Sequence, residues 1–135
     1  MDYKTTLTTC TYCGCGCNFF LETIDGKLTG TIPCKTSVVN EGKLCIKGWN
    51  VHQFVQSDKR LTHPLIRKDG ELTQVSWEEA IDYTADRLKT IHREKGSDSI
   101  GFFASAKVTN EENYLMQKFA RAGVGTNNVD HCARL

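Results

Sequence analysis

Hydrophobic and polar positions divide the chain near residue 60 into two parts with different patterns. In the first part, short runs of aromatic and β-branched residues alternate with turn residues. Residues 19–24 (FFLETI) and 27–32 (KLTGTI) predict two strands joined by a hairpin turn at Asp25–Gly26. A short helix is expected over residues 48–55. The pattern therefore predicts a β-rich region first.

The second part alternates helix and strand. Ser76 and Glu79 form a capping-box pattern that opens a helix, and Gly96 is expected to end it. Residues 99–105 (SIGFFAS) predict a buried strand, and Thr109 with Glu112 opens a second helix. A further strand is expected to begin over residues 127–132. The apolar positions expected to share a face are Trp77, Ala80, Ile81, Ala85, Leu88 and Ile91 in the first helix, and the inward positions of the second are Leu115, Met116, Phe119 and Ala122.

These patterns predict an α+β fold. Residues 1–60 form a small β-rich subdomain, and residues 61–135 form the opening α/β segment of a larger domain. The second segment has too few strand–helix units to close a doubly wound sheet by itself, so we interpret it as incomplete.

Composition narrows the function classes. The chain has 135 residues, of which 39% are hydrophobic and 24% charged, so it is expected to fold. The net charge of +1 offers no basic surplus for nucleic acid. There is no apolar run of the roughly 18 residues that a membrane span needs. The first ten residues lack the features of a secretion signal, so we predict a cytoplasmic location.

Seven cysteines are the unusual feature of the composition. An odd count without a secretion signal argues against a disulfide framework and favours a metal or cluster site. Cys10, Cys13 and Cys17 lie in one short loop with two glycines, and three close cysteines plus a distant one is the usual pattern for a [4Fe–4S] cluster.

The distant fourth ligand has two candidates. We prefer Cys45, because it lies in the glycine-flanked segment GKLCIKG, whereas Cys34 lacks comparable flanks. Cys15 lies between ligands and is interpreted as a non-ligand. A zinc site is the alternative for this set of cysteines, although Cys34 and Cys45 are spaced too widely for a typical second zinc knuckle.

With these cysteines in place, the chain resembles the molybdopterin oxidoreductase family over essentially its whole length. It is most similar to the N-terminal part of the catalytic (alpha) subunit of formate dehydrogenases. The segments that carry the resemblance are CTYCGCGCNF (10–19), GKLCIKGW (42–49), RLTHPLIR (60–67), VSWEEAIDY (75–83), AKVTNEENYLMQKFARA (106–122) and GTNNVDHCARL (125–135).

The resemblance implies a set of site residues. One [4Fe–4S] cluster is expected on Cys10, Cys13, Cys17 and Cys45, within a cluster subdomain of residues 1–60. Lys47 is expected on the electron path between the cluster and the pterin. Lys107 and Asn110 are expected to contact a molybdenum (or tungsten) bis-molybdopterin guanine dinucleotide bound by the larger domain. A lone lysine is most often an ordinary surface residue, but the Cys-x-Lys-Gly setting of Lys47 favours the relay role. On residue evidence alone, the segment at Lys107 is equally an ordinary capped helix.

The resemblance also implies a function. The full-length enzyme is expected to interconvert formate and CO2 and to pass electrons through the cluster to iron–sulfur or hydrogenase/diaphorase subunits. No catalytic residue is expected within residues 1–135, so we predict that the chain alone does not turn over formate. The alternatives are another family member resembling a nitrate reductase, a freestanding one-cluster electron carrier, and a zinc-stabilised binding module.

The resemblance places the metal-binding selenocysteine or cysteine directly after Leu135, followed by a histidine. We therefore hypothesise that the sequence stops at a selenocysteine codon. Cys132 and His131 are interpreted as structural, and the remaining histidines, His52, His63 and His92, as surface or hydrogen-bonded residues.

Overall fold

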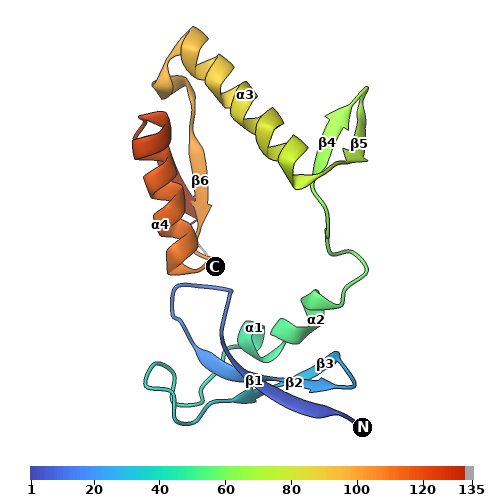
Figure 1. Ribbon diagram of the computed structural model, residues 1–135. Helices are drawn as coiled ribbons and strands as arrows, with labels where there is room; N and C mark the ends of the chain where they lie inside the picture. Colours follow the sequence, from blue (N-terminus) through green and yellow to red (C-terminus); the bar gives the residue numbers. More distant parts are fainter. Residues whose placement is uncertain (133–135) are drawn as a thin grey trace. The chain divides into compact units, whose positions relative to one another are not determined.

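The computed structural model describes residues 1–132 and divides the chain into two compact units (Figure 1). The first unit contains Met1–Arg60, Ser105–Tyr114, His131 and Cys132. The second contains Leu61–Ala104 and Leu115–Asp130. A β-rich region followed by helices and strands confirms the predicted α+β class. The hypothesis about the position after Leu135 lies outside the described residues.

The first unit is built on a three-stranded antiparallel sheet in the order β1-β2-β3. The strands are β1 (Tyr3–Thr9), β2 (Asn18–Ile24) and β3 (Lys27–Pro33). Asp25 and Gly26 both have positive φ angles, 49° and 79°, as the predicted two-residue hairpin turn requires. The sequence pattern predicted β2 and β3 but not β1, a threonine-rich strand (YKTTLTT) that pairs along its length with β2.

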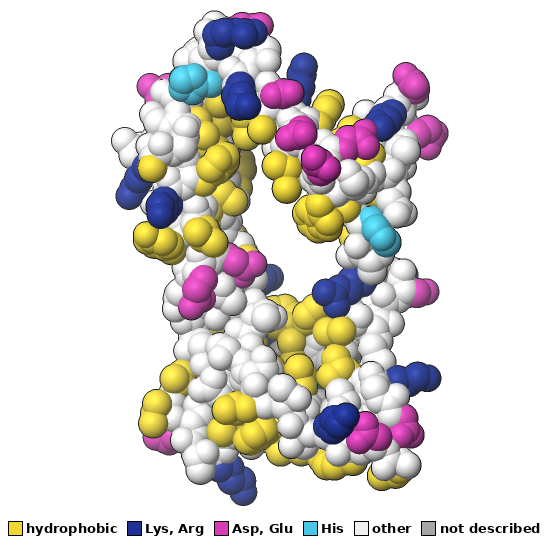
Figure 2. Space-filling model, in the orientation of Figure 1, with side chains coloured by type: hydrophobic (Ala, Val, Ile, Leu, Met, Phe, Trp, Pro, Cys, Tyr) yellow, Lys and Arg dark blue, Asp and Glu magenta, His cyan; other side chains and the backbone are white. Residues whose placement is uncertain are grey.

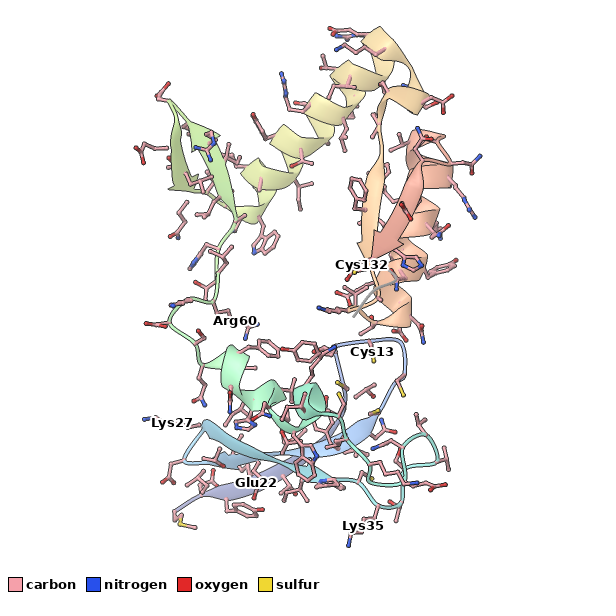
Figure 3. All side chains as sticks on the ribbon, turned by 180° about the vertical axis from the view of Figure 1, so that it is seen from behind. Cys13, Glu22, Lys27, Lys35, Arg60 and Cys132 are labelled. Atoms are coloured by element: carbon pink, nitrogen blue, oxygen red, sulfur yellow. The ribbon has the colours of Figure 1, made fainter. Side chains whose placement is uncertain are left out.

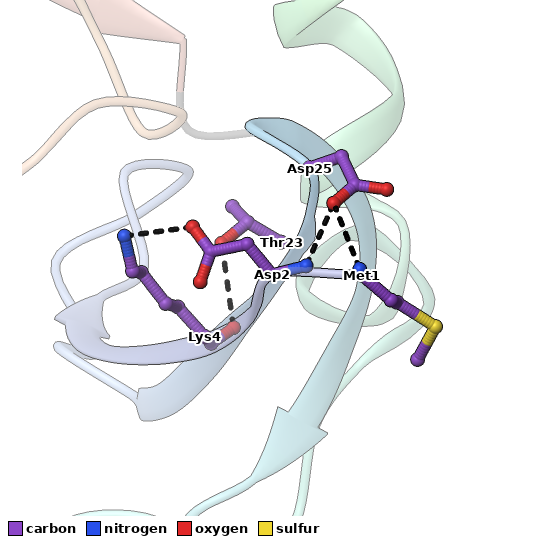
Figure 4. Close-up of polar contacts among 5 residues, drawn as sticks. All are labelled: Met1, Asp2, Lys4, Thr23 and Asp25. Atoms are coloured by element: carbon purple, nitrogen blue, oxygen red, sulfur yellow. Dashed lines mark hydrogen bonds and ion pairs between the residues drawn. The ribbon is translucent and has the colours of Figure 1, made fainter.

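The hairpin turn also holds the start of β1. The Asp2 N–H donates to Asp25 Oδ1 at 2.7 Å, and the N-terminal ammonium pairs with the same oxygen at 3.9 Å (Figure 4). Lys4 pairs with Asp2 at 2.9 Å, and the Thr23 hydroxyl donates to the Lys4 carbonyl at 3.4 Å. These contacts fix the first residues of β1 to the hairpin turn, which lies at the opposite end of the sheet from the cysteine loop.

The core of the first unit lies beneath that cysteine loop. Cys10, Phe19 and Val51 are buried, and Phe19 is only 1% exposed. Two short helices, α1 (Ile46–Trp49) and α2 (Val51–Val55), replace the single helix predicted over 48–55. The break falls at Asn50, whose side chain donates to the Ile46 carbonyl at 2.8 Å and so ends the first helix.

The second unit begins with a hairpin and a long helix. Strands β4 (Leu65–Lys68) and β5 (Glu71–Gln74) pair around a turn at Asp69–Gly70, and α3 runs over Trp77–Lys95. Ser76 caps α3 as predicted, accepting from the Glu79 N–H at 3.1 Å. The Glu79 carboxylate pairs with Lys68 at 2.6 Å. Gly96, with φ at 81°, follows the last turn as expected.

A strand–helix–strand segment follows the short helix η1 (Ser97–Ser99). It consists of β6 (Phe102–Ser105), α4 (Asn110–Lys118), η2 (Phe119–Val124) and β7 (Val129–Cys132). The N–H groups of Phe102 and Ala106 donate to the carbonyls of Asn128 and Cys132, so residue numbers rise together and the strands run parallel. The predicted α/β segment is confirmed, although β6 is shorter than residues 99–105 and Phe103 is 86% exposed.

The inward face predicted for the second helix was wrong in part. Leu115 and Phe119 are 60% and 48% exposed, whereas Ala120 and Val124 are buried. Phe119 begins the π-turn η2, where the wider turn changes which positions face inward, whereas Leu115 lies in α4 before that turn.

Apolar side chains remain uncovered on the second unit, where hydrophobic atoms gather over the faces of its helices and strands (Figure 2). No residue of α3 is buried, and Trp77 and Ile81 are 68% and 61% exposed. The predicted stripe on α3 is therefore exposed at Trp77 and Ile81 among the described residues, whereas its other members are half-buried: Ala80, Ala85, Leu88 and Ile91. Within residues 1–132, no helix combines the length and apolar character needed to cross a bilayer.

Candidate metal centre

The cysteine loop connects β1 to β2 and is closed at its base. The Cys10 N–H donates to the Cys17 carbonyl at 2.8 Å, continuing the β1–β2 ladder by one residue pair. Cys10 is 5% exposed in the core, and Cys17 is half-buried. Cys13 lies in the loop beyond this base, at the opposite end of the sheet from Lys27 (Figure 3). The sheet therefore sets the positions of the first and last cysteines of the loop.

The fourth predicted ligand reaches the same place from a distant segment. Cys45 directly precedes α1 and is exposed. Cys17 and Cys45 both line a hollow of about 620 Å³. The residues around that hollow are Cys15, Cys17, Val39, Asn40, Glu41, Lys43, Leu44 and Cys45. Two of the four predicted ligands, 28 positions apart in the sequence, thus face one space.

A buried asparagine brings the two segments together. Asn40 Oδ1 accepts from the Asn18 N–H at 2.9 Å, and Asn40 Nδ2 donates to the carbonyls of Asn18 and Lys43 at 3.2 and 2.9 Å. Asn18 follows the cysteine loop, and Lys43 leads to Cys45. The Ser37 hydroxyl extends the network by donating to Asn18 Oδ1 at 3.1 Å. One side chain therefore ties the exit of the cysteine loop to the approach to Cys45.

Asn40 and Asn18 were not among the site residues predicted from the sequence. A signal existed for Asn40, since it lies in the turn-rich stretch TSVVNEGK just before the fourth cysteine, where asparagine commonly bonds nearby backbone groups. The local pattern did not indicate that its partner is Asn18, 22 residues earlier in the sequence.

The thiols differ in acidity. The N–H of Gly48 holds the pKa of Cys45 below its ordinary value, helped by the Lys47 N–H and the Lys47 charge and opposed by burial. Burial raises the pKa of Cys17 to about 11, with further contributions from a hydrogen bond to Cys15 and from the neighbouring thiols. Crowded thiols resist gathering negative charge, and a bound cation reverses that preference by binding the thiolates.

The predicted donor set consists of thiols, the side chains that hold iron–sulfur clusters. Within residues 1–132, no three His, Cys, Asp or Glu side chains are grouped closely enough to hold one metal ion. A tetrahedral zinc site needs its ligands around one centre. A cube takes one thiolate at each of four irons, so its ligands stand further apart. Thiols from a glycine-containing loop and from the segment before α1 are donors of the kind that a cube uses.

The other cysteines occupy different surroundings. Cys34, the rival fourth ligand, is 5% exposed, contacts Thr36 Oγ1 at 3.5 Å and does not line the hollow. Cys15 is exposed and lines it. Cys132 lies on β7, and His131 precedes it.

Lys47, Lys107 and Asn110, the predicted relay and pterin contacts, all belong to the first unit. Lys47 lies in α1, two residues after Cys45, and is half-buried rather than fully solvated. Lys107 is exposed beside the capping box of α4. Asn110 has a partner that the sequence did not indicate: its side-chain nitrogen donates to the Gly14 carbonyl of the cysteine loop at 2.9 Å.

Gly14 and Asn110 fit closely. A Cβ atom at Gly14 would overlap Asn110 Oδ1 and lie 3.1 Å from Asn110 Cγ. The glycine at this position therefore allows the start of α4 to contact the cysteine loop.

Two of the remaining histidines have hydrogen-bonding partners. His52 contacts the Thr31 hydroxyl at 3.4 Å, and His63 contacts the Thr62 hydroxyl at 2.9 Å. His92 lies in α3 and borders an apolar hollow of the second unit. None of the three lies at the cysteine hollow.

A cysteine loop on a small antiparallel sheet, followed by a parallel strand–helix–strand segment, places the chain among cysteine-rich α+β proteins. The comparison with known families is specific. Residues 3–57 match the molybdopterin oxidoreductase Fe4S4 domain, and residues 60–135 match the molybdopterin oxidoreductase domain. The chain therefore belongs to the molybdopterin oxidoreductase family, whose cofactors are a [4Fe–4S] cluster and a molybdopterin.

Several similar curated proteins are named as formate dehydrogenases. F420-dependent formate dehydrogenase 1 subunit alpha of Methanococcus maripaludis is 54% identical over 95% of this chain and 18% of its own length. The corresponding subunit of Methanocaldococcus jannaschii is 48% identical over the whole chain and 19% of its own length. A putative formate dehydrogenase of Staphylococcus aureus is 47% identical over 97% of the chain. The chain thus spans under a fifth of the length of these relatives.

Among solved structures, acetylene hydratase from Pelobacter acetylenicus is similar, with a TM-score of 0.66 and 26% identity. The match covers 93% of this chain and 18% of that structure's chain.

Proposed function

We propose that Cys10, Cys13, Cys17 and Cys45 bind one [4Fe–4S] cluster, and that residues 1–60 are the cluster subdomain of a formate dehydrogenase catalytic subunit. The observation that carries this proposal is the hollow shared by Cys17 and Cys45, two cysteines from separate segments held together by Asn40. When bound, a cluster of this kind accepts and releases single electrons.

The residues of the chain have distinct parts in holding the cluster. Cys10 and Cys17 are fixed by the sheet at the base of the loop, and Gly14, which follows Cys13, leaves the backbone there free to bend. The amides of Gly48 and Lys47 favour the thiolate of Cys45, which is the form that binds iron. Lys47 places a positive charge two residues from a proposed ligand, and this charge would stabilise the cluster after it gains an electron. The position of Lys47 therefore suits a role on the electron path.

We further propose interconversion of formate and CO2 by the full-length enzyme. The names of the three relatives support this assignment. The fold alone does not, since a protein named as a hydratase shares it. Residues 61–135 are then the N-terminal portion of the domain that binds molybdenum or tungsten bis-molybdopterin guanine dinucleotide. Lys107, exposed beside the start of α4, and Asn110 are candidate contacts to it.

The proposed setting is cytoplasmic, with the rest of the catalytic subunit and electron-transfer subunits as partners. The word "subunit" in the names of two relatives supports an assembly of more than one chain.

Anaerobic reconstitution with iron, sulfide and a thiol reductant tests the cluster assignment. We expect a brown protein with about four irons and four sulfides per chain, and a signal from a paramagnetic cluster after reduction. Cys45→Ser should lose most of the iron, whereas Cys34→Ser, at the buried cysteine outside the hollow, should retain it. Equal iron retention in the two variants, or a colourless wild-type chain that binds one zinc, would overturn the proposal.

Formate oxidation is expected to be absent from residues 1–135 alone, because these residues are proposed to hold the cluster and only part of the domain that binds the pterin. An anaerobic dye-reduction assay on the reconstituted chain checks this. Steady formate-dependent reduction would contradict it. Reversible one-electron cycling by a stable monomer would instead support a freestanding electron carrier.

A further inference from the structure

The cysteine loop contains a thiol pair that the cluster assignment does not use. Cys15 Sγ lies 3.5 Å from Cys17 Sγ. Cys15 is exposed and lines the same hollow as Cys17. The hydrogen-bond contact of the Cys17 sulfur is with Cys15 rather than with Cys10 or Cys13. A predicted ligand therefore has a non-ligand thiol as its immediate neighbour.

The backbone between these two cysteines permits them to bond. Gly16 has a φ of +73°, in the left-handed region that glycine adopts without strain, and a Cβ there would meet no atom within 4 Å. The loop is therefore open around Gly16, which leaves room for the two sulfur atoms to approach the covalent S–S distance of about 2.05 Å.

We propose that Cys15 and Cys17 form a reversible disulfide when the chain lacks its cluster and meets a small disulfide such as oxidised glutathione. One cysteine thiolate attacks a glutathione sulfur and releases one glutathione, leaving a mixed disulfide on the protein. The other cysteine then attacks the protein-bound sulfur and releases the second glutathione. The protein thiols lose two electrons, the glutathione disulfide gains them, and the two thiol protons end on the two released glutathiones.

The consequence for the cluster rests on the proposed function. The disulfide removes Cys17 from the ligand set, so the chain cannot assemble its cluster until a thiol reductant reopens the bond. Cys15 thereby determines whether an oxidised, cluster-free chain is held in a reversible state.

Disulfide mapping tests the pairing without the cluster. The cluster-free, reduced chain is incubated with oxidised glutathione, its remaining thiols are alkylated, and the products are located by fragmentation mass spectrometry. We expect Cys15 and Cys17 to be protected as an intrachain pair and Cys10 and Cys13 to be alkylated. Cys15→Ser should accumulate glutathione on Cys17 instead, and Cys34→Ser should behave as wild type. A disulfide between Cys17 and Cys10 or Cys13, or an unchanged yield of intrachain disulfide in Cys15→Ser, would overturn the inference.

Iron uptake separates this inference from the proposed function. The oxidised wild-type chain should take up at least fivefold less iron and sulfide than the reduced chain, and dithiothreitol should restore the uptake. A reduced chain that takes up no iron would refute the cluster assignment, while the mapping still decides the pairing. Full iron uptake by a chain shown to carry the Cys15–Cys17 disulfide would refute the proposed blocking of Cys17.

Discussion

Replacing Asn40 with alanine should destabilise the first unit more than any surface change nearby. The substitution removes three hydrogen bonds and leaves the Asn18 N–H and the Asn18 and Lys43 carbonyls without the partner that satisfies them. A net hydrogen bond contributes about 1 kcal/mol, and an unsatisfied buried group costs about 1–3 kcal/mol. Asn18 and Lys43 are less buried than Asn40, so water can replace part of the loss. We therefore expect a decrease of about 2–4 kcal/mol in the free energy of unfolding.

Tryptophan fluorescence provides the assay. The first unit contains Trp49 and the second contains Trp77, so a Trp77→Phe background leaves one reporter in the unit of interest. Urea unfolding of the reduced, cluster-free chain then gives the free energy from the midpoint and slope. Asn40→Asp should also destabilise, because a carboxylate accepts from the Asn18 N–H but cannot donate to the two carbonyls.

The neighbouring Glu41 offers a matched control. Its carboxylate is 72% exposed and pairs only at the surface, with Lys43 at 3.4 Å. Exposed pairs of this kind contribute about 0–1 kcal/mol, so Glu41→Ala should be nearly neutral. If Asn40→Ala falls within 0.5 kcal/mol of Glu41→Ala, a margin set by the scatter of ordinary surface substitutions, Asn40 does not hold the two segments together.

Three further predictions concern thiol reactivity, the core and a helix cap. In the cluster-free chain, iodoacetamide at pH 8 should modify Cys45 faster than Cys17. The pKa of Cys45 is lowered and that of Cys17 is raised to about 11, so raising the pH toward 11 should accelerate Cys17 more; mass spectrometry that finds equal rates at pH 8 contradicts this. Phe19→Ala should cost about 3–5 kcal/mol in the urea assay, because Phe19 is 1% exposed, whereas Leu7→Ala, at a 56% exposed position of the same sheet, should cost under about 1 kcal/mol. Ser76→Ala should lower the free energy of unfolding by about 1 kcal/mol, because it removes the acceptor at the start of α3, and Ser76→Gly should lower it by only a few tenths of that. Helix content on heating measures both effects. Identical melting curves for the two variants would contradict the capping role.

Local chemistry made part of the fold predictable. The turn at Asp25–Gly26 and the caps at Ser76 and Gly96 depend on neighbouring residues, and the structure has them where the sequence predicted them. The inward face of the second helix was predicted incorrectly at Phe119 because the π-turn over Phe119–Val124 changes which positions face inward, and no single residue in FARAGV announces such a turn.

The candidate site shows the same division between local and distant information. The spacing of Cys10, Cys13 and Cys17 is visible in the sequence, whereas the choice between Cys34 and Cys45 rested there on flanking residues. The structure adds that Cys34 is buried elsewhere and Cys45 lines the hollow. The Asn40 network joins segments far apart along the chain, so its geometry depends on the folded sheet and no local pattern contains it.

The bond between the Cys10 N–H and the Cys17 carbonyl has a consequence for protein engineering. Because this bond extends the β1–β2 ladder, the six residues between these cysteines form an insert whose two ends are already fixed by the sheet. Inserts from other family members, including longer ones, should therefore graft between the same two anchors without shifting strand register. The same sheet can then carry different cysteine loops, and each loop changes the electronic surroundings of the metal cluster.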